Sequence, residues 1–201
     1  MTTLLLVRHG ETDWNAAHRI QGSSDIPLND TGRAQARETA AMLAERFAGV
    51  RPFVVSSDLS RARETAQIIA AALGAGEPRA YPLLRERAYG VAEGLSVREY
   101  FERFGAWDRE SVPDAETSPE LRRRAVGAVQ RIVRDARRLH APLDVPVIAV
   151  SHGGLIAQLI RHASGGTLPL AGERLANAST HEFLVERHHL SVRSYTAVPI
   201  T

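Results

Sequence analysis

The chain has 201 residues, of which 44% are hydrophobic and 24% are charged. This balance is typical of one folded globular domain and argues against a disordered chain. Cysteine is absent, which excludes disulfides and thiolate chemistry.

All basic side chains except histidine are arginines, because the sequence contains no lysine. Arginine stays charged to very high pH, so a formal net charge of +2 is enough to raise the sequence pI to about 9.5. The basic pI is therefore weak support for nucleic-acid binding. The absence of lysine also excludes Schiff-base chemistry and a lysine P-loop, and it favours bidentate recognition of phosphate or carboxylate by arginine.

The apolar runs of the chain are short. The first, Leu4 to Val7, lacks the length and the preceding basic region of a signal peptide. No later run approaches the roughly 20 residues of a membrane-spanning helix. We therefore expect no membrane partner, and the absence of cysteine agrees with the cytoplasmic location that we expect.

The first predicted element is a buried strand from Leu4 to Val7 that ends at Arg8, His9 and Gly10. In an open parallel sheet, ligands bind just beyond the carboxyl ends of the strands, so Arg8 and His9 would meet a ligand. Taken alone, the same pattern describes equally well a strand end with two solvated polar residues.

Hydrophobic periodicity and turn residues predict the remaining elements. The first is a helix that is capped by Asn29, Asp30 or Thr31 and ends near Gly49, and a strand over 52–56 and a helix that runs to 73, capped by Ser57, Asp58 or Ser60, follow it. An irregular segment then begins at 83 and leads to a short helix that buries Tyr100, Phe101 and Phe104 and to a linker or lid over 111–119. The last elements are a helix over 121–139, a strand over 145–150, a helix after 154, and paired strands over 181–186 and 190–195. Strands that alternate with helices favour an α/β layered fold around a largely parallel sheet.

The helix over 121–139 carries arginines on the face opposite its apolar stripe, and these are Arg124, Arg131, Arg134 and Arg138. Such a row could bind an acidic partner. A solvated helix face is the commoner explanation, and we adopt it.

A second strand end repeats the opening pattern, because the strand over 145–150 is followed by Ser151, His152 and Gly153. If the two strands are parallel neighbours, His9 and His152 converge at one edge of the sheet. A single histidine there would more often be structural, but two at equivalent positions, each followed by glycine, favour an active site. A metal site is less favoured, because no HxxxH or carboxylate pairing accompanies them.

A phosphoryl group would fit between these histidines. Arg8 adjoins His9, and Arg61 lies near the start of the second predicted helix, where helix N–H groups attract anions. Guanidinium groups bind phosphoryl oxygens bidentately, and a neutral imidazole is a competent nucleophile toward phosphorus.

Such a reaction also needs a carboxylic acid, which protonates the leaving alkoxide and then activates water. Glu86, beside a glycine-marked loop, is a candidate. The residues alone allow Glu11 or Glu93 equally well.

Several motifs in order along the chain resemble those of the histidine phosphatase superfamily, the phosphoglycerate-mutase-like enzymes. They are residues 6–15 (LVRHGETDWN), 19–22 (RIQG), 25–28 (DIPL), 32–36 (GRAQA), 56–62 (SSDLSRA), 84–86 (LRE) with 89–90 (YG) and 93–96 (EGLS), and 150–154 (VSHGG). The resemblance covers nearly the whole chain as a single domain. It implies a three-layer α/β/α sandwich around a mostly parallel sheet, with a small irregular or helical lid at about 87–120.

The resemblance also assigns roles to residues. It implies that His9 becomes phosphorylated, that Glu86 is the general acid and base, and that Arg8, Arg61 and His152 stabilise the transferring group. It adds phosphate or substrate contacts, which are Asn15, Gln21 and Gly22. Such enzymes need no metal or other cofactor, and their partner is a small phosphate ester rather than nucleic acid.

The chain departs from the family pattern in the lid region. Ala92 stands where the phosphatase branch commonly has tryptophan, and Ala115-Glu116-Thr117 replaces the usual Gly-Glu-Ser. Neither departure touches the presumed chemistry, but both alter the surroundings of the substrate.

Three functions remain as alternatives. We favour a phosphatase that hydrolyses a small phosphomonoester through a phosphohistidine. A phosphoglycerate mutase is less favoured, because the chain is compact between Glu86 and His152 and has no lysine for a substrate carboxylate. A non-catalytic phosphate-binding module is least favoured, because the catalytic residue types are intact. The substrate and the oligomeric state stay open, and a homodimer would be unsurprising.

Overall fold

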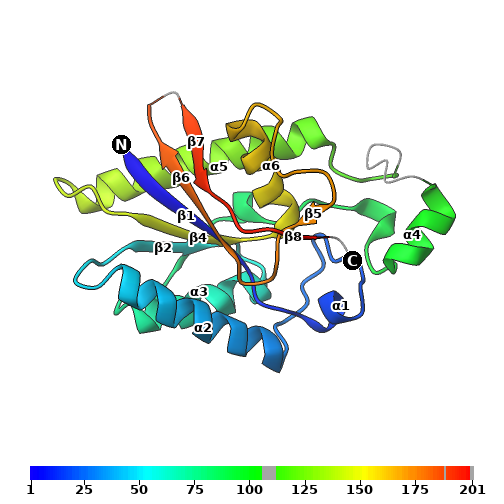
Figure 1. Cartoon of the computed structure of the whole chain (residues 1–201), viewed down its shortest axis with the longest axis horizontal. Coiled ribbons are helices and arrows are strands. Elements are labelled where there is room, and N and C mark those ends of the chain that lie inside the picture. Colours follow the sequence, from blue (N-terminus) through cyan, green and yellow to red (C-terminus); the bar gives the residue numbers. More distant parts are fainter. Residues whose placement is uncertain (106–111, 188, 200–201) are drawn as a thin grey trace.

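A six-stranded sheet forms the centre of the protein. The computed structural model describes residues 1–105, 112–187 and 189–199 (Figure 1). The strand order is β3-β2-β4-β1-β6-β7, and β1, β2, β3 and β4 are mutually parallel, whereas β6 and β7 add an antiparallel edge. The strands are β1 (Thr2–Arg8), β2 (Phe53–Ser56), β3 (Arg79–Ala80), β4 (Val147–Ser151), β6 (Thr180–Val185) and β7 (Leu190–Ser194), and a separate small sheet pairs β5 (Glu173–Arg174) with β8 (Val198–Pro199).

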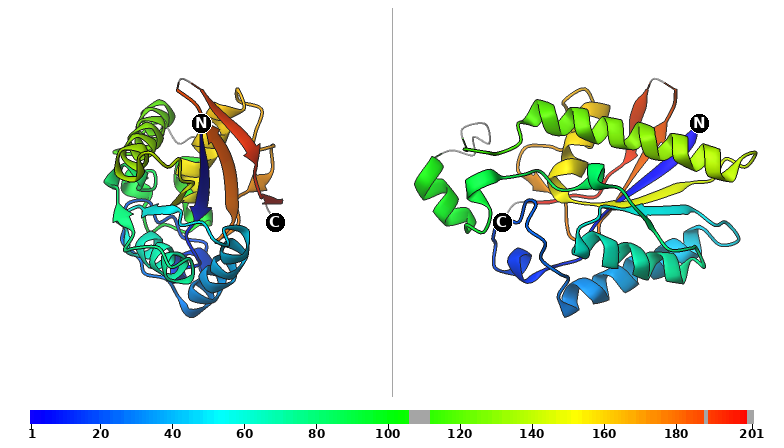
Figure 2. Two further views of the ribbon diagram at one scale, coloured as in Figure 1. Left: turned by 90° about the vertical axis from the view of Figure 1, so that its left-hand side faces the viewer. Right: turned by 180° about the vertical axis from the view of Figure 1, so that it is seen from behind.

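Helices cover both faces of this sheet (Figures 1 and 2). The helices α2 (Asp30–Arg46) and α3 (Ser60–Ala72) lie on one face, and α5 (Ser118–His140) and α6 (Gly153–Ala163) lie on the other. The predicted three-layer α/β/α sandwich around a mostly parallel sheet is therefore confirmed.

The central strand β1 explains why both faces need a helical layer. Leu4 and Leu6 belong to the core cluster that includes α5 and α6, whereas Leu5 and Val7 belong to the cluster that includes α2 and α3. Successive side chains of a strand point to opposite faces, so a run of four buried apolar residues requires cover on both sides.

The ends of the helices on the α2–α3 face differ from the prediction in detail. Asn29 caps α2 by accepting a bond from the Gly32 amide at 2.8 Å, but α2 ends at Arg46 rather than near Gly49. None of the predicted residues is the N-cap of α3. That position is Leu59, and the Asp25 carboxylate from a distant loop accepts the Ser60 amide instead, at 2.7 Å.

Smaller elements lie beyond the carboxyl ends of the parallel strands (Figure 1). They are α1 (Asp13–Ala16), the 3-10 turns Pro82–Leu84 and Gly90–Ala92, and α4 (Val97–Phe104). In α4, Tyr100 is buried as predicted, but Phe101 is 44% exposed, because the helix packs through one narrow face only. The helix α1 has no counterpart in the prediction.

The expected lid at 87–120 falls partly outside the described residues, which omit 106–111. Its described parts pair with each other, since Tyr89 bridges Ala115 and the Val91 amide donates to Pro113 O at 3.2 Å. Gly90 permits this approach, because a Cβ there would lie 2.0 Å from Pro113 O.

Arg124 corrects the prediction of a solvated arginine row on α5. Its side chain is only 21% exposed and turns toward the segment that carries Glu86. Arg131, Arg134 and Arg138 are exposed as expected. No described helix combines the length and the hydrophobicity that crossing a membrane requires.

Candidate active site

The carboxyl ends of β1 and β4 bring the two histidines together. The strands are parallel neighbours with Arg8 in register with Ser151, and the His9 amide donates to Ser151 O at 2.9 Å. As a result, the ring centroids of His9 and His152 lie 5.1 Å apart. The convergence predicted from the two strand ends is confirmed.

The His9 ring is held in one tautomer. Its Nδ1 lies 2.6 Å from Gly10 O, and since a carbonyl only accepts, Nδ1 carries the proton and Nε2 has a free lone pair. Burial lowers the pKa of His9 well below 6.5, and the positive charges of Arg61 and Arg8 lower it further. The ring is therefore neutral at pH 7, as a nucleophile must be.

His152 is buried and neutral for the same reasons. Burial, then Arg61, His9 and Arg8, lower its pKa well below 6.5. Neither of its ring nitrogens has a hydrogen-bond partner within the described part of the chain. A buried polar group without a partner is costly, so an incoming anion that accepts from His152 would relieve that cost.

The buried guanidinium group of Arg61 and the partly buried one of Arg8 add positive charge to the same place. Arg61 is anchored by Nη1 on Ser24 O at 2.7 Å and by Nη2 on Gly22 O at 2.8 Å, and Arg8 donates through Nη1 to Leu175 O. In both residues the Nε–H has no partner among the described residues. Burial lowers the pKa of both guanidiniums, yet arginine stays charged in proteins.

The structure distinguishes among the three candidate carboxylates. Only Glu86 lines the cavity beside the histidines. Glu93 instead binds the neighbouring loop, accepting from the Ser23 amide at 2.9 Å and the Ser24 amide at 3.0 Å. Glu11 accepts from the Asn29 side chain at 3.0 Å, away from the cavity.

The Glu86 carboxylate lies at the N-terminus of α6. Its Oε2 accepts from the Gly154 amide at 2.9 Å, and its Oε1 accepts from the Leu155 amide at 3.1 Å. The N-terminus of a helix favours negative charge, and these bonds fix the carboxylate next to His152. Gly154 makes the approach feasible, because a Cβ there would lie 2.6 Å from Glu86 Oε1.

The predicted phosphate contacts also line this cavity. Asn15 is fixed through its Oδ1, which accepts from the Thr12 amide at 3.2 Å and from Asn177 Nδ2 at 3.1 Å, so its own NH₂ group is available to a ligand. Gln21 is almost buried, and Gly22 adopts a φ of 56°, which glycine tolerates best.

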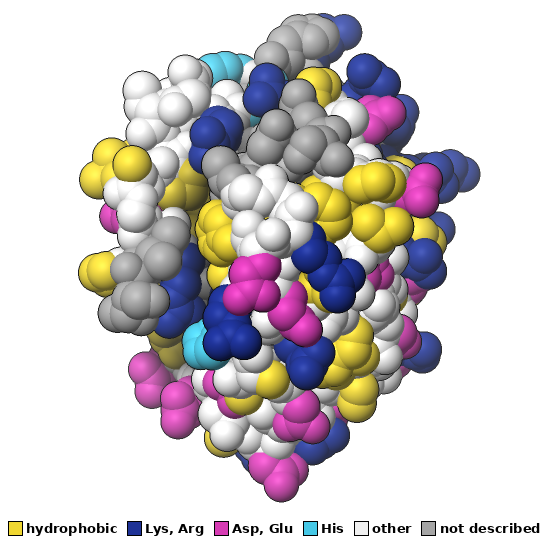
Figure 3. All heavy atoms as spheres, turned by 90° about the vertical axis from the view of Figure 1, so that its right-hand side faces the viewer, with side chains coloured by type: hydrophobic (Ala, Val, Ile, Leu, Met, Phe, Trp, Pro, Cys, Tyr) yellow, Lys and Arg dark blue, Asp and Glu magenta, His cyan; other side chains and the backbone are white. Residues whose placement is uncertain are grey.

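The cavity has a volume of about 140 Å³, which suits a small anionic group. It is lined by Arg8, His9, Asn15, Arg19, Ile20, Gln21, Gly22, Arg61, Glu86 and Tyr89. The parallel strands point toward the end of the molecule shown in Figure 3, where arginine side chains alternate with acidic and hydrophobic ones. No group of three or more histidine, aspartate or glutamate side chains that could hold a metal ion occurs in the described ranges.

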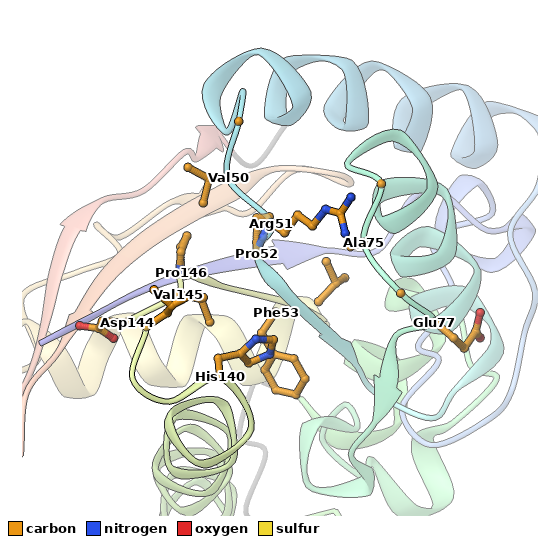
Figure 4. Close-up of a pocket in the computed structure, with 15 residues that line it drawn as sticks. Val50, Arg51, Pro52, Phe53, Ala75, Glu77, His140, Asp144, Val145 and Pro146 are labelled. Carbon is orange, nitrogen blue, oxygen red and sulfur yellow. The ribbon is translucent and has the colours of Figure 1, made fainter.

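A larger cavity, of about 660 Å³, lies at the opposite end of the sheet (Figure 4). It is formed where the chain enters β2 and β4, with the Phe53 ring 5.4 Å from that of His140. It contains neither converging histidines nor buried arginines, so the smaller cavity is the better candidate for the chemistry.

Three residues at the site escaped the sequence analysis. Asn177 joins β1 to the loop before β6, since its Nδ2 donates to His9 O at 3.2 Å as well as to Asn15. Arg19 and Tyr89 line the cavity. Both belong to motifs already noted, so they could have been found there, whereas nothing in the sequence around Asn177 marks it.

The fold and the site define an α/β protein with two neutral histidines beside a positively charged pocket whose size and charge suit a phosphoryl group. The family model of the histidine phosphatase superfamily (branch 1) matches residues 4–197. The chain belongs to this superfamily, as its motifs predict.

Relatives and solved structures agree with this assignment. The chain is 37% identical over 194 residues to the uncharacterized phosphatase PhoE of Bacillus subtilis, covering 93% of this chain and 91% of the relative. It is 38% identical over 182 residues to the probable phosphoglycerate mutase GpmB of Serratia proteamaculans, covering 87% and 79%. A mycobacterial glucosyl-3-phosphoglycerate phosphatase, solved as a complex with VO₃, superposes with a TM-score of 0.81 at 28% identity, covering 98% of this chain and 100% of that one. The prediction of a phosphatase of this family is confirmed.

Proposed function

We propose that this protein hydrolyses a small phosphomonoester through a covalent phosphohistidine at His9. One observation carries the proposal: His9 Nδ1 donates a hydrogen bond to Gly10 O at 2.6 Å. The neutral ring therefore has a free lone pair on Nε2, in a cavity that Arg8 and Arg61 line. Nothing else in the described cavity combines a nucleophilic lone pair with such a concentration of positive charge.

In the first step, His9 Nε2 attacks phosphorus and the bond from phosphorus to the ester oxygen breaks. The Nε–H groups of Arg8 and Arg61, which have no partner in the described structure, donate to the equatorial oxygens, where charge accumulates. The unpaired imidazole of His152 offers a further donor. These groups are held before substrate arrives, so the protein need not reorganise during the reaction.

Glu86 donates and then accepts the proton that the two steps require. A protonated Glu86 gives its proton to the departing alkoxide, and the resulting carboxylate then takes a proton from the water that attacks the phosphohistidine. This second attack releases inorganic phosphate and restores His9. The carboxylate position beside the Gly154 amide, at 2.9 Å, is compatible with the second role, because the bond holds the carboxylate in place next to His152.

A mutase would use the same phosphohistidine but would return the phosphoryl group to a product. The relatives named as probable phosphoglycerate mutases keep this alternative open. The phosphatase is supported by the relative and the solved structure that are named as phosphatases. A product assay with phosphoglycerate, with and without a bisphosphate primer, separates the two, since only a mutase would depend on the primer and isomerise the substrate.

The proposal includes several features of the wider protein. We assign residues 1–201 to a single domain, in which 87–120 acts as the lid that decides substrate choice, and place the protein in the cytoplasm. Its partner is a small phosphate ester, with neither nucleic acid nor membrane involved, and a homodimer is compatible with this function. The pairing of Tyr89 with Ala115 supports a lid beside the cavity, because Tyr89 lines it.

The experiment that tests the proposal is to trap the intermediate. Wild-type protein mixed with a ³²P-labelled phosphomonoester and quenched in alkali should retain acid-labile phosphate on His9, and His9→Ala should retain none and lose turnover. The His140→Ala variant is the matched control, because His140 lies at the opposite end of the sheet. Full hydrolysis by His9→Ala would reject the mechanism, whereas tight phosphate binding without turnover of any ester in a broad panel would favour the binding module.

A further inference from the structure

Arg124 of α5 binds the backbone of the segment that carries Glu86. Its Nη1 donates to Leu83 O at 3.0 Å and to Arg85 O at 2.8 Å, and its Nη2 donates to Glu86 O at 3.2 Å. A carbonyl oxygen accepts more strongly from a charged donor than from a neutral one. A single side chain therefore restrains the backbone on both sides of Arg85.

Glu116 holds that guanidinium in place from the other side. Its Oε1 accepts from Arg124 Nε at 2.8 Å, and its Oε2 accepts from Arg124 Nη2 at 2.6 Å. The two side chains are only 21% and 15% exposed, so water screens the pair weakly. The fork-to-fork geometry requires arginine, because the ammonium of lysine is a point charge without two parallel donors.

Glu116 is itself fastened to the same segment. The Glu116 amide donates to Ala88 O at 2.9 Å, which lies just after Glu86 in the chain. The Glu116 side chain binds Arg124, which in turn bonds to the backbone just before Glu86. The carboxylate of Glu86 meanwhile bonds to the start of α6. The backbone of Glu86 is thus tied to α5 and its carboxylate to α6, and these two ties set where the acid lies relative to the phosphoryl group.

We propose that Arg124 and Glu116 are positioning residues for the acid–base step, acting through the backbone of Glu86 rather than by contact with substrate. The inference rests on the proposed function, because it concerns the acid of that reaction. It assigns a role to Glu116, which lies between the two departures from the family pattern at Ala115 and Thr117. A displacement of about 1 Å in a catalytic group can cost roughly 10²-fold in rate, so the loss of either partner should be large.

The test uses leaving groups of different basicity. Departure of an alkoxide needs protonation, whereas departure of an aryl oxide with a low pKa needs little. In Arg124→Gln, kcat for an alkyl phosphate should fall by about 10²-fold, kcat for an aryl phosphate should fall by less than about 5-fold, and KM should change little. Arg124→Lys should be nearly as impaired, because it keeps the charge but loses the fork.

Two further variants keep the test decisive. Glu116→Gln removes the charge of the partner while keeping its shape, so it should show the same selective loss even if Arg124→Gln folds poorly. Arg134→Gln changes an exposed arginine on the same helix and should leave both rates unchanged. Amide hydrogen exchange provides a readout without activity, since residues 83–89 should exchange faster in Arg124→Gln and in Glu116→Gln than in wild type or Arg134→Gln.

The outcomes separate this inference from the proposed function. If the wild type needs His9 for turnover but the Arg124 and Glu116 variants lose alkyl and aryl rates equally, or lose neither, the positioning role is rejected and the phosphatase proposal stands. If His9→Ala hydrolyses both esters as fast as wild type, the proposed function itself fails. Unchanged exchange at 83–89 in both variants would also overturn the positioning role.

Discussion

The buried rings of His9 and His152 lie 5.1 Å apart, close to the guanidinium groups of Arg8 and Arg61. The pKa of each histidine is lowered well below 6.5, first by burial and next by Arg61. Their closeness is tolerable because both rings are neutral. If both were protonated, two more positive charges would lie beside the guanidinium groups of Arg8 and Arg61.

We predict that both rings remain neutral at mildly acidic pH. In phosphate-free buffer, the NMR signals of the His9 and His152 rings should keep the values of neutral imidazole from pH 8 down to pH 6, because each folded-state pKa lies well below 6.5. The His9→Ala and His152→Ala spectra assign the two sets of signals. A titration midpoint at or above 6.5 for His9 would contradict the assignment of a neutral nucleophile.

Replacement of the acid should be selective for the leaving group. We predict that Glu86→Gln lowers kcat for an alkyl phosphate by about 10²- to 10³-fold and lowers kcat for an activated aryl phosphate by less than about 10-fold. The measurement is steady-state hydrolysis of the two ester types. Equal losses for both would remove Glu86 from the acid role.

Glu93→Gln is the matched comparison for Glu86. The Glu93 carboxylate accepts from the amides of Ser23 and Ser24, and Ser24 O in turn accepts from Arg61. Its replacement should disturb phosphate binding and so slow alkyl and aryl esters alike. The two glutamates would then be distinguished by whether the alkyl rate alone or both the alkyl and the aryl rates fall, and not by the size of the loss in rate.

Asn177 should matter for phosphate binding although it does not line the cavity. Its Nδ2 donates to Asn15 Oδ1 at 3.1 Å and to His9 O at 3.2 Å, which fixes the Asn15 amide with its NH₂ group free. We predict that Asn177→Ala costs about 1 kcal/mol of stability and weakens inorganic phosphate binding by about 10-fold, as the loss of one hydrogen bond to a charged ligand would suggest.

The control for Asn177 is a polar side chain remote from the site. Ser164 accepts from the Leu168 amide at 3.0 Å beyond the end of α6, so Ser164→Ala should lower stability to a similar degree without changing the phosphate affinity measured by calorimetry. Equal phosphate affinities for wild type and Asn177→Ala would show that Asn15 needs no such support.

The sequence predicted the parts of the site that strand periodicity determines. Four buried residues before Arg8 and His9 require a central strand, and the repeat of that pattern before His152 places the two histidines at one edge once the strands are parallel neighbours. The choice among Glu11, Glu86 and Glu93 could not follow from the residues alone. It depends on which loop folds back onto the start of α6, and no local pattern encodes that.

Arg124 and Asn177 are two further residues whose contacts could not be predicted from the sequence. Arg124 has the spacing of a solvated helix face, and only the path of residues 83–86 across α5 turns it into a partner of Glu86 O. Asn177 lies in a loop without periodicity, where its contacts with His9 and Asn15 join segments more than 160 residues apart in sequence. Long-range contacts of this kind become visible only when the chain is folded.

His181 is a buried histidine in β6 that the proposed reaction does not use. Ser179 Oγ donates to Ala176 O at 2.6 Å, so His181 Nε2 donates to Ser179 Oγ at 3.0 Å, while its Nδ1 accepts from the Thr196 amide at 3.3 Å. The ring is therefore a neutral tautomer. Burial, and to a smaller extent the charge of Arg8, lower the pKa of His181 to about 4.

This low pKa should make the fold sensitive to acid. Well above pH 6.5 the ring is neutral in the folded and unfolded states alike. As the pH falls from 6.5 to 4, the unfolded chain gains a proton that the folded protein does not, so the free energy of unfolding falls, by about 3 kcal/mol for this group. We predict that His181→Asn, although less stable at pH 8, loses less stability between pH 8 and pH 4.5 than wild type does.

Urea unfolding at several pH values measures this difference. Ser179→Ala is the control, because it removes a partner of His181 and keeps the titrating ring, so its stability should still decline with falling pH as in wild type. A His181→Asn curve parallel to that of wild type would show that His181 contributes nothing to the acid sensitivity. Any decline that remains in His181→Asn should include contributions from His9 and His152, whose lowered pKa values act in the same direction.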